Sequence, residues 1–187
     1  MRGVGTAAAY PITKALKNAG NQVISIIGAR TRDLIILEDE MRKNSDELYI
    51  STDDGSEGQK GFVSDVLKLL IEKGKHFDLV YVIGPPLMMR ATVNVAKFYS
   101  LKTIVSLNPI MVDGCGMCGA CRVTFGDNTK FACLDGPEFE GNIVDFNELI
   151  KRLNVYKTEE KQALDLQLSK MKRRTNFECN QFPKIMH

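Results

Sequence analysis

The chain has few histidines, little net charge and no long apolar run. Its two histidines, His76 and His187, lie far from the cysteines, which argues against a Rieske-type centre. No apolar stretch reaches the roughly 18 residues that a membrane-spanning helix requires. The net charge is only +2, so neither nucleic acid nor an acidic membrane surface is indicated as a partner.

The amino-terminal residues also lack the features of a secretory signal. Met1-Arg2-Gly3 does not begin an apolar signal core. In proteins without such a signal, clustered cysteines are more often metal ligands than disulfides. We therefore expect a cytoplasmic location and look for a metal site among the cysteines.

Residues 1–108 alternate between helical and strand-like patterns. Helices are predicted over 5–20, 32–44, 61–74 and 87–100, and strands over 22–28, 47–52, 77–84 and 102–108. Pro11 is compatible with the first helix if it lies in the first turn. Strands separated by helices indicate parallel crossovers and hence a doubly wound α/β sheet. Ligands in such sheets bind at the carboxyl ends of the strands.

Two loops near predicted strand ends contain glycines suited to a dinucleotide. In "RGVGTAA" (2–8), Gly3, Gly5 and Ala8 fit G-x-G-x-x-A, in which backbone N–H groups approach a pyrophosphate. A tight turn before a helix would explain the same residues. In "IGARTRD" (27–33), Gly28 ends a strand, and Arg30 is either a phosphate contact or a solvated surface charge.

A third loop, "IGPPLMM" (83–89), places Gly84 and Pro85 in a rigid turn that could pass close to a nicotinamide ribose. Methionines 88 and 89 are more often core residues than cofactor contacts. The stretch 52–61, "TDDGSEGQKG", is predicted to be a polar surface loop. The strand that should precede Gly3 is expected to be missing, since only two residues stand before it.

Four of the five cysteines lie within residues 115–133, at positions 115, 118, 121 and 133. A structural zinc site usually pairs two C-x2-C knuckles, and the second knuckle is missing in this chain. The bacterial cubane pattern C-x2-C-x2-C-x3-C would need a cysteine where Phe125 stands. Zinc and a [4Fe–4S] cluster therefore match the spacing poorly.

The spacing agrees better with a plant-type [2Fe–2S] motif, C-x4-C-x2-C followed by a distant cysteine. Asp113 then occupies the first position, and the ligands are Asp113, Cys118, Cys121 and Cys133. A carboxylate is a suitable hard ligand for ferric iron. Cys115 competes with Asp113 for the fourth position, and a different metal remains an alternative.

Two runs, "MVDGCGMCGACRV" (111–123) and "FACLDGPEF" (131–139), carry a family resemblance. They resemble the NAD-binding iron–sulfur subunit of NADH-dependent reduced ferredoxin:NADP oxidoreductase, a family that includes subunits named sulfide dehydrogenase. The family is related to the electron transfer subunit of dihydroorotate dehydrogenase. "TDDGSEGQKGFV" and "GPPLMM" are similar to its ferredoxin–NADP reductase-like nucleotide domain. The resemblance extends from Gly3 to about Lys157.

The resemblance implies a full subunit with an FAD-binding β-barrel, a nucleotide domain and a cluster domain. In this chain it implies an NAD(P)-binding domain over 1–108, a [2Fe–2S] domain over 109–146 and a helical tail over 147–187. FAD would be bound mainly by the barrel, which this sequence does not include. Candidate cofactor-binding residues are Gly3, Gly5, Thr6, Gly28, Arg30, Asp54, Gly84, Pro85 and Met88.

The implied metal ligands are again Asp113, Cys118, Cys121 and Cys133. Asp113 replaces the cysteine of the dihydroorotate dehydrogenase subunit, whereas Cys115 departs from the threonine common in the ferredoxin-linked family. The implied function is electron transfer between NAD(P)H, FAD and the cluster toward a larger flavin/iron–sulfur partner subunit, with ferredoxin as a further partner. This chain alone is expected to catalyse little. The alternatives are an electron transfer subunit for pyrimidine biosynthesis and a zinc-stabilised interaction module.

The carboxyl-terminal stretch 145–174 is predicted to be one amphipathic helix with a charged outer face. It would serve as a packing or solvated helix, or it would dock to a partner subunit. No site is predicted at Cys179 or in the basic run 172–174.

Overall fold

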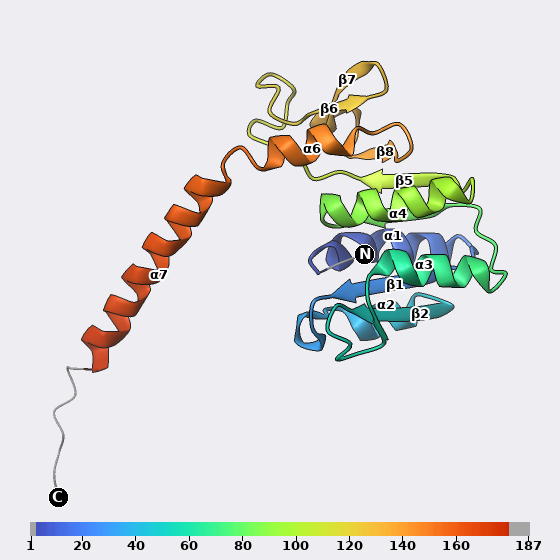
Figure 1. Cartoon of the computed structure of the whole chain (residues 1–187), viewed down its shortest axis with the longest axis horizontal. Helices are drawn as coiled ribbons and strands as arrows, with labels where there is room; N and C mark the ends of the chain where they lie inside the picture. Colours follow the sequence, from blue (N-terminus) through green and yellow to red (C-terminus); the bar gives the residue numbers. More distant parts are fainter. Residues whose placement is uncertain (1–2, 180–187) are drawn as a thin grey trace, which may run out of the picture. The chain divides into compact units, whose positions relative to one another are not determined.

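The computed structural model describes residues 3–179, with side chains through residue 171 (Figure 1). Its helices are α1 (Gly5–Asn18), η1 (Arg32–Leu34), α2 (Glu38–Lys43), α3 (Val63–Glu72), α4 (Pro86–Phe98), α5 (Ala132–Asp135), α6 (Phe146–Leu153) and α7 (Lys157–Cys179). Its strands are β1 (Ile24–Ala29), β2 (Glu47–Thr52), β3 (Gln59–Lys60), β4 (Val80–Ile83), β5 (Thr103–Ser106), β6 (Arg122–Phe125), β7 (Asn128–Phe131) and β8 (Glu138–Glu140). The side chains of Cys179 and of the basic run 172–174 lie outside this description, as does His187.

The chain forms two compact units, Met1–Ile150 and Lys151–His187. The predicted division at residue 108 therefore stays a prediction, because the first unit includes both the α/β layer and the cysteine-containing segment. Across residues 3–179, no helix is both long enough and apolar enough to span a bilayer.

The sheet of the first unit consists of two halves with separate hydrogen bonding. In one half β1 pairs in parallel with β2 along all six residues, and β3 adds to β2. In the other half β4 pairs in parallel with β5, and β8 adds antiparallel to β5. In the part of the chain that the structure describes, no strand joins β1 to β4. Both are therefore edge strands.

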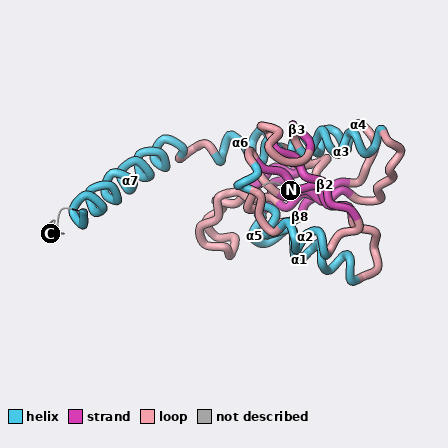
Figure 2. The backbone as a smooth tube through the Cα atoms, turned by 90° about the horizontal axis from the view of Figure 1, so that it is seen from below, coloured by secondary structure: helices cyan, strands magenta, loops and turns pink. Residues whose placement is uncertain are grey.

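Helices cover both faces of the strands, as expected for a doubly wound fold. Figure 2 shows α3 and α4 on one side of the strands and α1 and α2 on the other. The apolar stripes of α3 and α4 form much of the core, which contains Val63, Val66, Leu67, Leu70, Met88, Met89, Val93 and Ala96. Both methionines are buried core residues, because they lie on the inner face of α4 against β4 and β5.

The cysteine-containing segment is attached to the second half of the sheet. Its hairpin, β6–β7, turns at Gly126, whose φ of +60° is easily adopted by glycine. The strand β8 then continues the sheet beside β5, with Phe139 opposite Val105. The Leu107 N–H, just after β5, donates to the Pro137 carbonyl oxygen, just before β8, at 2.9 Å. The cysteine-containing segment therefore leaves the sheet at the end of β5 and returns to it beside the same strand.

Two of the predicted helices were wrong in extent. The predicted helix 32–44 is interrupted between η1 and α2, where Leu37 has a φ of +57°, a left-handed conformation that cannot continue a right-handed helix. The predicted helix 145–174 is two helices, separated at residues 154–156. Its amphipathic character is confined to α6, which buries Phe146 and Leu149.

Two smaller expectations also need correction. Pro11 lies in the second turn of α1, not the first. There it leaves the carbonyl oxygen four residues earlier without its helical donor. The polar loop 52–61 is not wholly irregular, because β3 within it pairs in parallel with the end of β2.

Candidate functional site

The four candidate nucleotide-binding glycines lie close together at the carboxyl ends of β1 and β4. The Gly3 N–H donates to the Gly28 carbonyl oxygen at 3.1 Å. A Cβ added to Gly5 would lie 2.9 Å from the Ile83 carbonyl oxygen and 3.0 Å from the Gly84 Cα. Glycine at position 5 therefore lets the first turn of α1 approach the end of β4. This is the edge at which doubly wound sheets bind their ligands.

Arg30 and Asp54 lie in the loops that follow β1 and β2, and backbone hydrogen bonding joins the two loops. The Asp54 N–H donates to the Arg30 carbonyl oxygen at 3.3 Å, and the Arg30 side chain is exposed. The Asp54 carboxylate accepts the Ser56 hydroxyl at 2.7 Å and the Ser56 N–H at 3.0 Å. These bonds lower the pKa of Asp54, which stabilises an ionised carboxylate as an organiser of its own loop.

The remaining candidates differ in how they are placed. Thr6 is buried in the first turn of α1, and its N–H donates to the Gly3 carbonyl oxygen at 2.9 Å. Pro85 directly precedes α4. Met88 is buried and, together with Gly28 and Phe62, lines a cavity of about 10 Å³. Met88 thus packs beneath the edge formed by the glycines.

The residues that close the glycine-rich loop over this edge were not predicted from the sequence. Arg32 forms an ion pair with Glu57, and its N–H donates to the Ser56 hydroxyl at 2.9 Å. Phe62, which is 55% exposed, presents an aromatic ring at the same edge. Its position directly after a glycine-rich loop and before a helix was the available sequence signal.

Asp113 is held within the cysteine loop by two backbone N–H groups. Its carboxylate accepts the Cys115 N–H at 3.0 Å and the Cys118 N–H at 2.6 Å. These two bonds lower the pKa of Asp113, so its carboxylate is ionised at neutral pH. Gly116, with a φ of +83°, completes the turn, and a Cβ there would lie 2.3 Å from Leu134 Cδ1.

Cys121 and Cys133 meet where the ends of the β6–β7 hairpin come together. The Ala132 N–H donates to the Cys121 carbonyl oxygen at 3.1 Å, and the two sulfur atoms lie 3.2 Å apart. The hydrogen bond between the Cys121 and Cys133 sulfur atoms raises the pKa of the Cys133 thiol, and partial burial raises it further. A bound metal would reverse this balance, because metals bind the thiolate form.

The four predicted ligands thus lie in two pairs, Asp113 with Cys118 and Cys121 with Cys133. Within residues 3–179 no three metal-binding side chains are gathered at one point. The loop that carries Asp113 and Cys118 nevertheless lies beside Cys133, because a Cβ at Gly116 would lie 2.3 Å from Cδ1 of the next residue, Leu134, and the Gly116 backbone lowers the pKa of Cys133. Three thiols, a carboxylate and inward N–H groups are a donor set that fits an iron–sulfur cluster. Cys115 is exposed on the same loop.

Comparison with protein families assigns domains to both parts of the chain. Residues 2–94 match the oxidoreductase NAD-binding domain. Residues 108–145 match the iron–sulfur cluster binding domain of dihydroorotate dehydrogenase B. These matches confirm the expected [2Fe–2S] cluster and NAD(P) as cofactors of the two parts.

Individual relatives agree with these domains. The chain is 52% identical over 159 residues to a Thermotoga maritima protein named dihydroorotate dehydrogenase B (NAD(+)), electron transfer subunit homolog; the match covers 85% of this chain and 56% of the relative. A Methanopyrus kandleri protein, a probable dihydroorotate dehydrogenase B electron transfer subunit, is 38% identical over 73% of this chain and 51% of its own length.

A solved structure is also similar. A chain from the NADH-dependent reduced ferredoxin–NADP oxidoreductase, described in connection with flavin-based electron bifurcation, superposes with a TM-score of 0.82 at 46% identity. The match covers 89% of this chain and 60% of that one. These similarities confirm both the resemblance and the fold class predicted from the sequence. The chain spans only about half to three-fifths of the length of these relatives.

Proposed function

Because the chain contains an oxidoreductase NAD-binding domain and an iron–sulfur cluster binding domain of the dihydroorotate dehydrogenase B type, we propose that it is the electron-transfer part of a flavin/iron–sulfur oxidoreductase. The bound cofactors would supply hydride and single-electron chemistry, passing electrons between NAD(P)H, FAD and a [2Fe–2S] cluster. The observation that carries the proposal is the pairing of Asp113 with Cys118 beside Cys121 and Cys133.

The residues of this chain would position the cofactors. Gly3 has open space where a side chain would stand, and Gly5 packs the amino end of α1 closely against Gly84 at the end of β4. The N–H groups at this end of α1 would favour a phosphate. Arg30 and Asp54 would border the same edge from the neighbouring loops. Thr6, Gly28, Pro85 and Met88 would shape the floor of the site.

On the cluster side, Asp113, Cys118, Cys121 and Cys133 are the proposed ligands. Closing the two pairs around a cluster would draw the loop 113–121 toward the hairpin. Cys115 is the alternative to Asp113 because it lies on the same loop.

The proposal includes a larger assembly. We propose that the partner is a larger flavin/iron–sulfur subunit, that ferredoxin is a further partner, and that the complex is cytoplasmic. FAD would be bound mainly by a β-barrel that lies outside these 187 residues. Turnover by this chain alone would then be low.

A second candidate function is the electron transfer subunit of dihydroorotate dehydrogenase in pyrimidine biosynthesis. It is favoured by the family match of residues 108–145 and by the names of the Thermotoga and Methanopyrus relatives. Reduction of the cluster by dihydroorotate in the presence of a dihydroorotate dehydrogenase subunit, but not by ferredoxin and its partner, would favour this candidate.

The decisive experiment is an anaerobic preparation of the wild type and three variants. Iron, sulfide and zinc are counted per chain, and visible and EPR spectra are recorded. Two irons and two sulfides are expected in the wild type. Asp113→Ala is expected to alter or lose the spectrum, whereas Asp127→Ala, at the exposed tip of the β6–β7 hairpin, is the matched control and should leave it unchanged.

The third variant, Cys115→Ser, separates the two candidate ligands. An altered spectrum in Cys115→Ser with an unchanged one in Asp113→Ala would assign the fourth ligand to Cys115. Zinc without sulfide in the anaerobic wild type would contradict electron transfer and leave the zinc-stabilised interaction module.

A further inference from the structure

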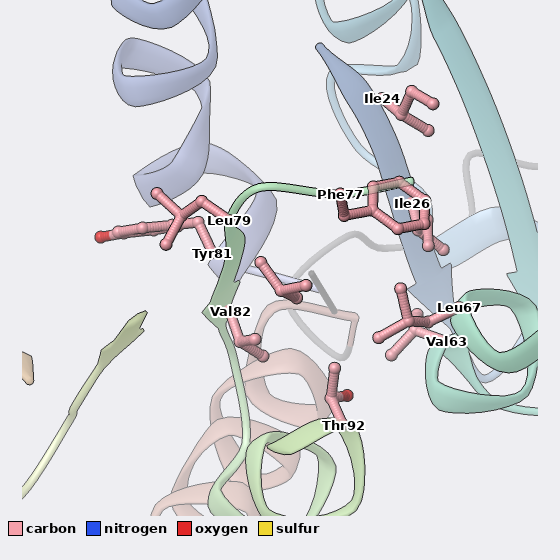
Figure 3. Close-up of a pocket in the computed structure, with 10 residues that line it drawn as sticks. Ile24, Ile26, Val63, Leu67, Phe77, Leu79, Tyr81, Val82 and Thr92 are labelled. Atoms are coloured by element: carbon pink, nitrogen blue, oxygen red, sulfur yellow. The ribbon is translucent and has the colours of Figure 1, made fainter. Parts of the chain in front are cut away.

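Part of the donor set of the proposed cluster site lies at the surface of the first unit. The cavities of about 90 and 270 Å³ lie between β1 and β4, and no residue of the cysteine loop, 107–121, lines them. Figure 3 shows the smaller cavity, with Ile26 of β1 and Val82 of β4 among its walls. Cys118 is exposed and Cys133 is half-buried. Individual side chains beside the cysteine loop therefore decide how closely water approaches these sulfur atoms.

Leu134 lies beside this donor set because it directly follows Cys133 in α5. The backbone of this short helix is held at both ends. Ala132 is fully buried, and its N–H donates to the Cys121 carbonyl oxygen at 3.1 Å. The Asp135 carboxylate accepts the N–H of the residue before α5 at 2.7 Å. A substitution at position 134 therefore changes the side chain without removing the contacts that hold the helix.

The Leu134 side chain packs over Gly116 of the cysteine loop. A Cβ built on Gly116 would overlap Leu134 Cδ1 and would lie 3.1 Å from its Cγ and 3.9 Å from its Cδ2. The branched end of the leucine thus occupies the space that a side chain at position 116 would take. Because Gly116 lies between Asp113 and Cys118 in the chain, this contact connects the segment of one proposed ligand pair to the helix that carries a ligand of the other.

The other face of the same side chain meets water, since Leu134 is 63% exposed. An apolar group in this position excludes water from one side of the backbone and donor atoms beneath it. Solvent access and the local dielectric contribute to the reduction potential of an iron–sulfur cluster. Water stabilises the reduced form more than the oxidised form, because the reduced form carries more negative charge. A side chain that excludes water therefore lowers the potential.

We propose that Leu134 is a positioning residue for the cluster. By packing over Gly116, it holds the cysteine loop against α5 and keeps water from that side of the cluster. Both effects act on the bound group: the reduction potential is lower and the loss of iron is slower than they would be without this side chain. The inference rests on the proposed function, because it concerns a residue beside the proposed ligands.

The test uses the full chain, prepared anaerobically as the wild type, Leu134→Ala and Leu134→Met. Iron and sulfide are counted, the midpoint potential is measured by a titration followed by EPR, and the release of iron to a chelator is followed with time. In Leu134→Ala the potential should shift to a more positive value, and iron should be released roughly tenfold faster. Leu134→Met supplies an apolar side chain of similar volume and should restore both values.

Met117→Ala is the matched control. It removes an apolar side chain of similar size from the same loop, at a residue that is 87% exposed. The potential and the rate of iron release should stay at their wild-type values in this variant, because Met117 leaves the space over Gly116 to Leu134.

A second measurement tests the contact between positions 116 and 134 without using the cluster. Gly116→Ala introduces a Cβ that meets Leu134. Its loss of stability, measured by urea unfolding, should be smaller in the Leu134→Ala background than in the wild type, because the two substitutions are coupled through this contact. Equal losses in the two backgrounds would overturn the contact and with it the proposal.

The spectroscopic results distinguish the inference from the proposed function. Wild-type potential and wild-type iron release in Leu134→Ala, with a full complement of iron and sulfide, would overturn the role of Leu134 alone. Equal changes in Leu134→Ala and Met117→Ala would also overturn it. A wild type without iron and sulfide would instead overturn the proposed function. Loss of the cluster from Leu134→Ala but not from Leu134→Met during preparation would support the proposal, because it is the extreme case of faster iron release.

Discussion

Gly58 and Gly20 both have a positive φ, +63° and +85°, but their surroundings differ. A Cβ at Gly58 would lie 2.2 Å from the Ile50 carbonyl oxygen, whereas nothing lies within 4 Å of a Cβ at Gly20. Gly20→Ala should therefore lower the free energy of unfolding by about 1–2 kcal/mol, the cost of placing a residue with a Cβ in the left-handed conformation. Gly58→Ala should cost about 1–3 kcal/mol more, because the backbone of the glycine-rich loop must move away from β2. Urea unfolding measures the free energy of unfolding of both variants. Equal losses of stability in the two would contradict a close contact between position 58 and the Ile50 carbonyl oxygen.

A second residue-scale prediction concerns Tyr81. Burial raises the pKa of this phenol to about 12, and the hydrogen bond to Glu138, at 2.9 Å, also raises it. A raised pKa in the folded state means stability that is complete below the unfolded pKa of about 10 and is lost as pH rises toward 12. The free energy of unfolding should fall over this range.

The measurement is urea unfolding at several pH values between these limits. In Tyr81→Phe the fall should be shallower than in the wild type. The control is Tyr99→Phe, which removes a hydroxyl that lies 3.3 Å from Glu72. This variant should keep the part of the pH-dependent fall in stability that is due to Tyr81. Identical slopes in the wild type and Tyr81→Phe would refute the assignment.

At the scale of elements, α7 differs from the other α-helices because its side chains over residues 157–171 are all exposed. Leu164, Leu166 and Leu168 are spaced two residues apart, which places successive leucines on opposite sides of the helix. Leu164, Leu168 and Met171 share one side of the helix and Leu166 lies on the other. All four are exposed, so α7 buries no apolar face over residues 157–171. Its contribution to the stability of residues 1–150 should therefore be small.

Ending the chain after Lys157 tests this expectation. The free energy of unfolding should change by less than about 0.5 kcal/mol, as for other exposed positions. Urea unfolding followed by far-UV circular dichroism is the measurement. Co-purification with the partner subunit is the second readout, and its loss on truncation would show that α7 docks to that partner.

At the scale of the whole molecule, the cysteine loop is the part that most needs its cofactor. Residues 107–121 contain no helix or strand. The loop is held by the hydrogen bonds that the Asp113 carboxylate accepts, by the Cys121–Cys133 contact and by the bond from the Leu107 N–H to the Pro137 carbonyl oxygen. Because metal binding and folding are coupled when ligands come from separate segments, removing the cluster should loosen this loop. The strands β1 and β2 share no ligand with it.

Hydrogen exchange of the reconstituted and the chelator-treated protein tests this prediction. Amides over residues 113–121 should exchange at least about tenfold faster without the cluster. Amides of β1 and β2 serve as the internal control and should not change. Uniformly faster exchange across the α/β layer would mean that the cluster supports the whole unit.

Much of the local structure could be predicted because it depends on near neighbours in the chain. The strand 47–52 has the predicted bounds, and the helix 61–74 is only slightly longer than α3. The helix 32–44 was wrong because tertiary packing favours a left-handed residue at Leu37, where Ile35 and Leu37 both pack against the buried cluster of Ile27, Met41 and Ile50. No local pattern encodes that preference.

For the site, residue type and spacing alone identified a loop of thiols, glycines and one carboxylate, because ligand chemistry depends on side chains and short separations. The sequence by itself therefore determined which donor side chains are available, the glycine loops and the alternation of helices and strands. Only the tertiary structure decided that Cys121 meets Cys133 and that Gly3 pairs with Gly28. These contacts join residues far apart in the chain, so they depend on how hairpins and sheet edges pack rather than on any local pattern.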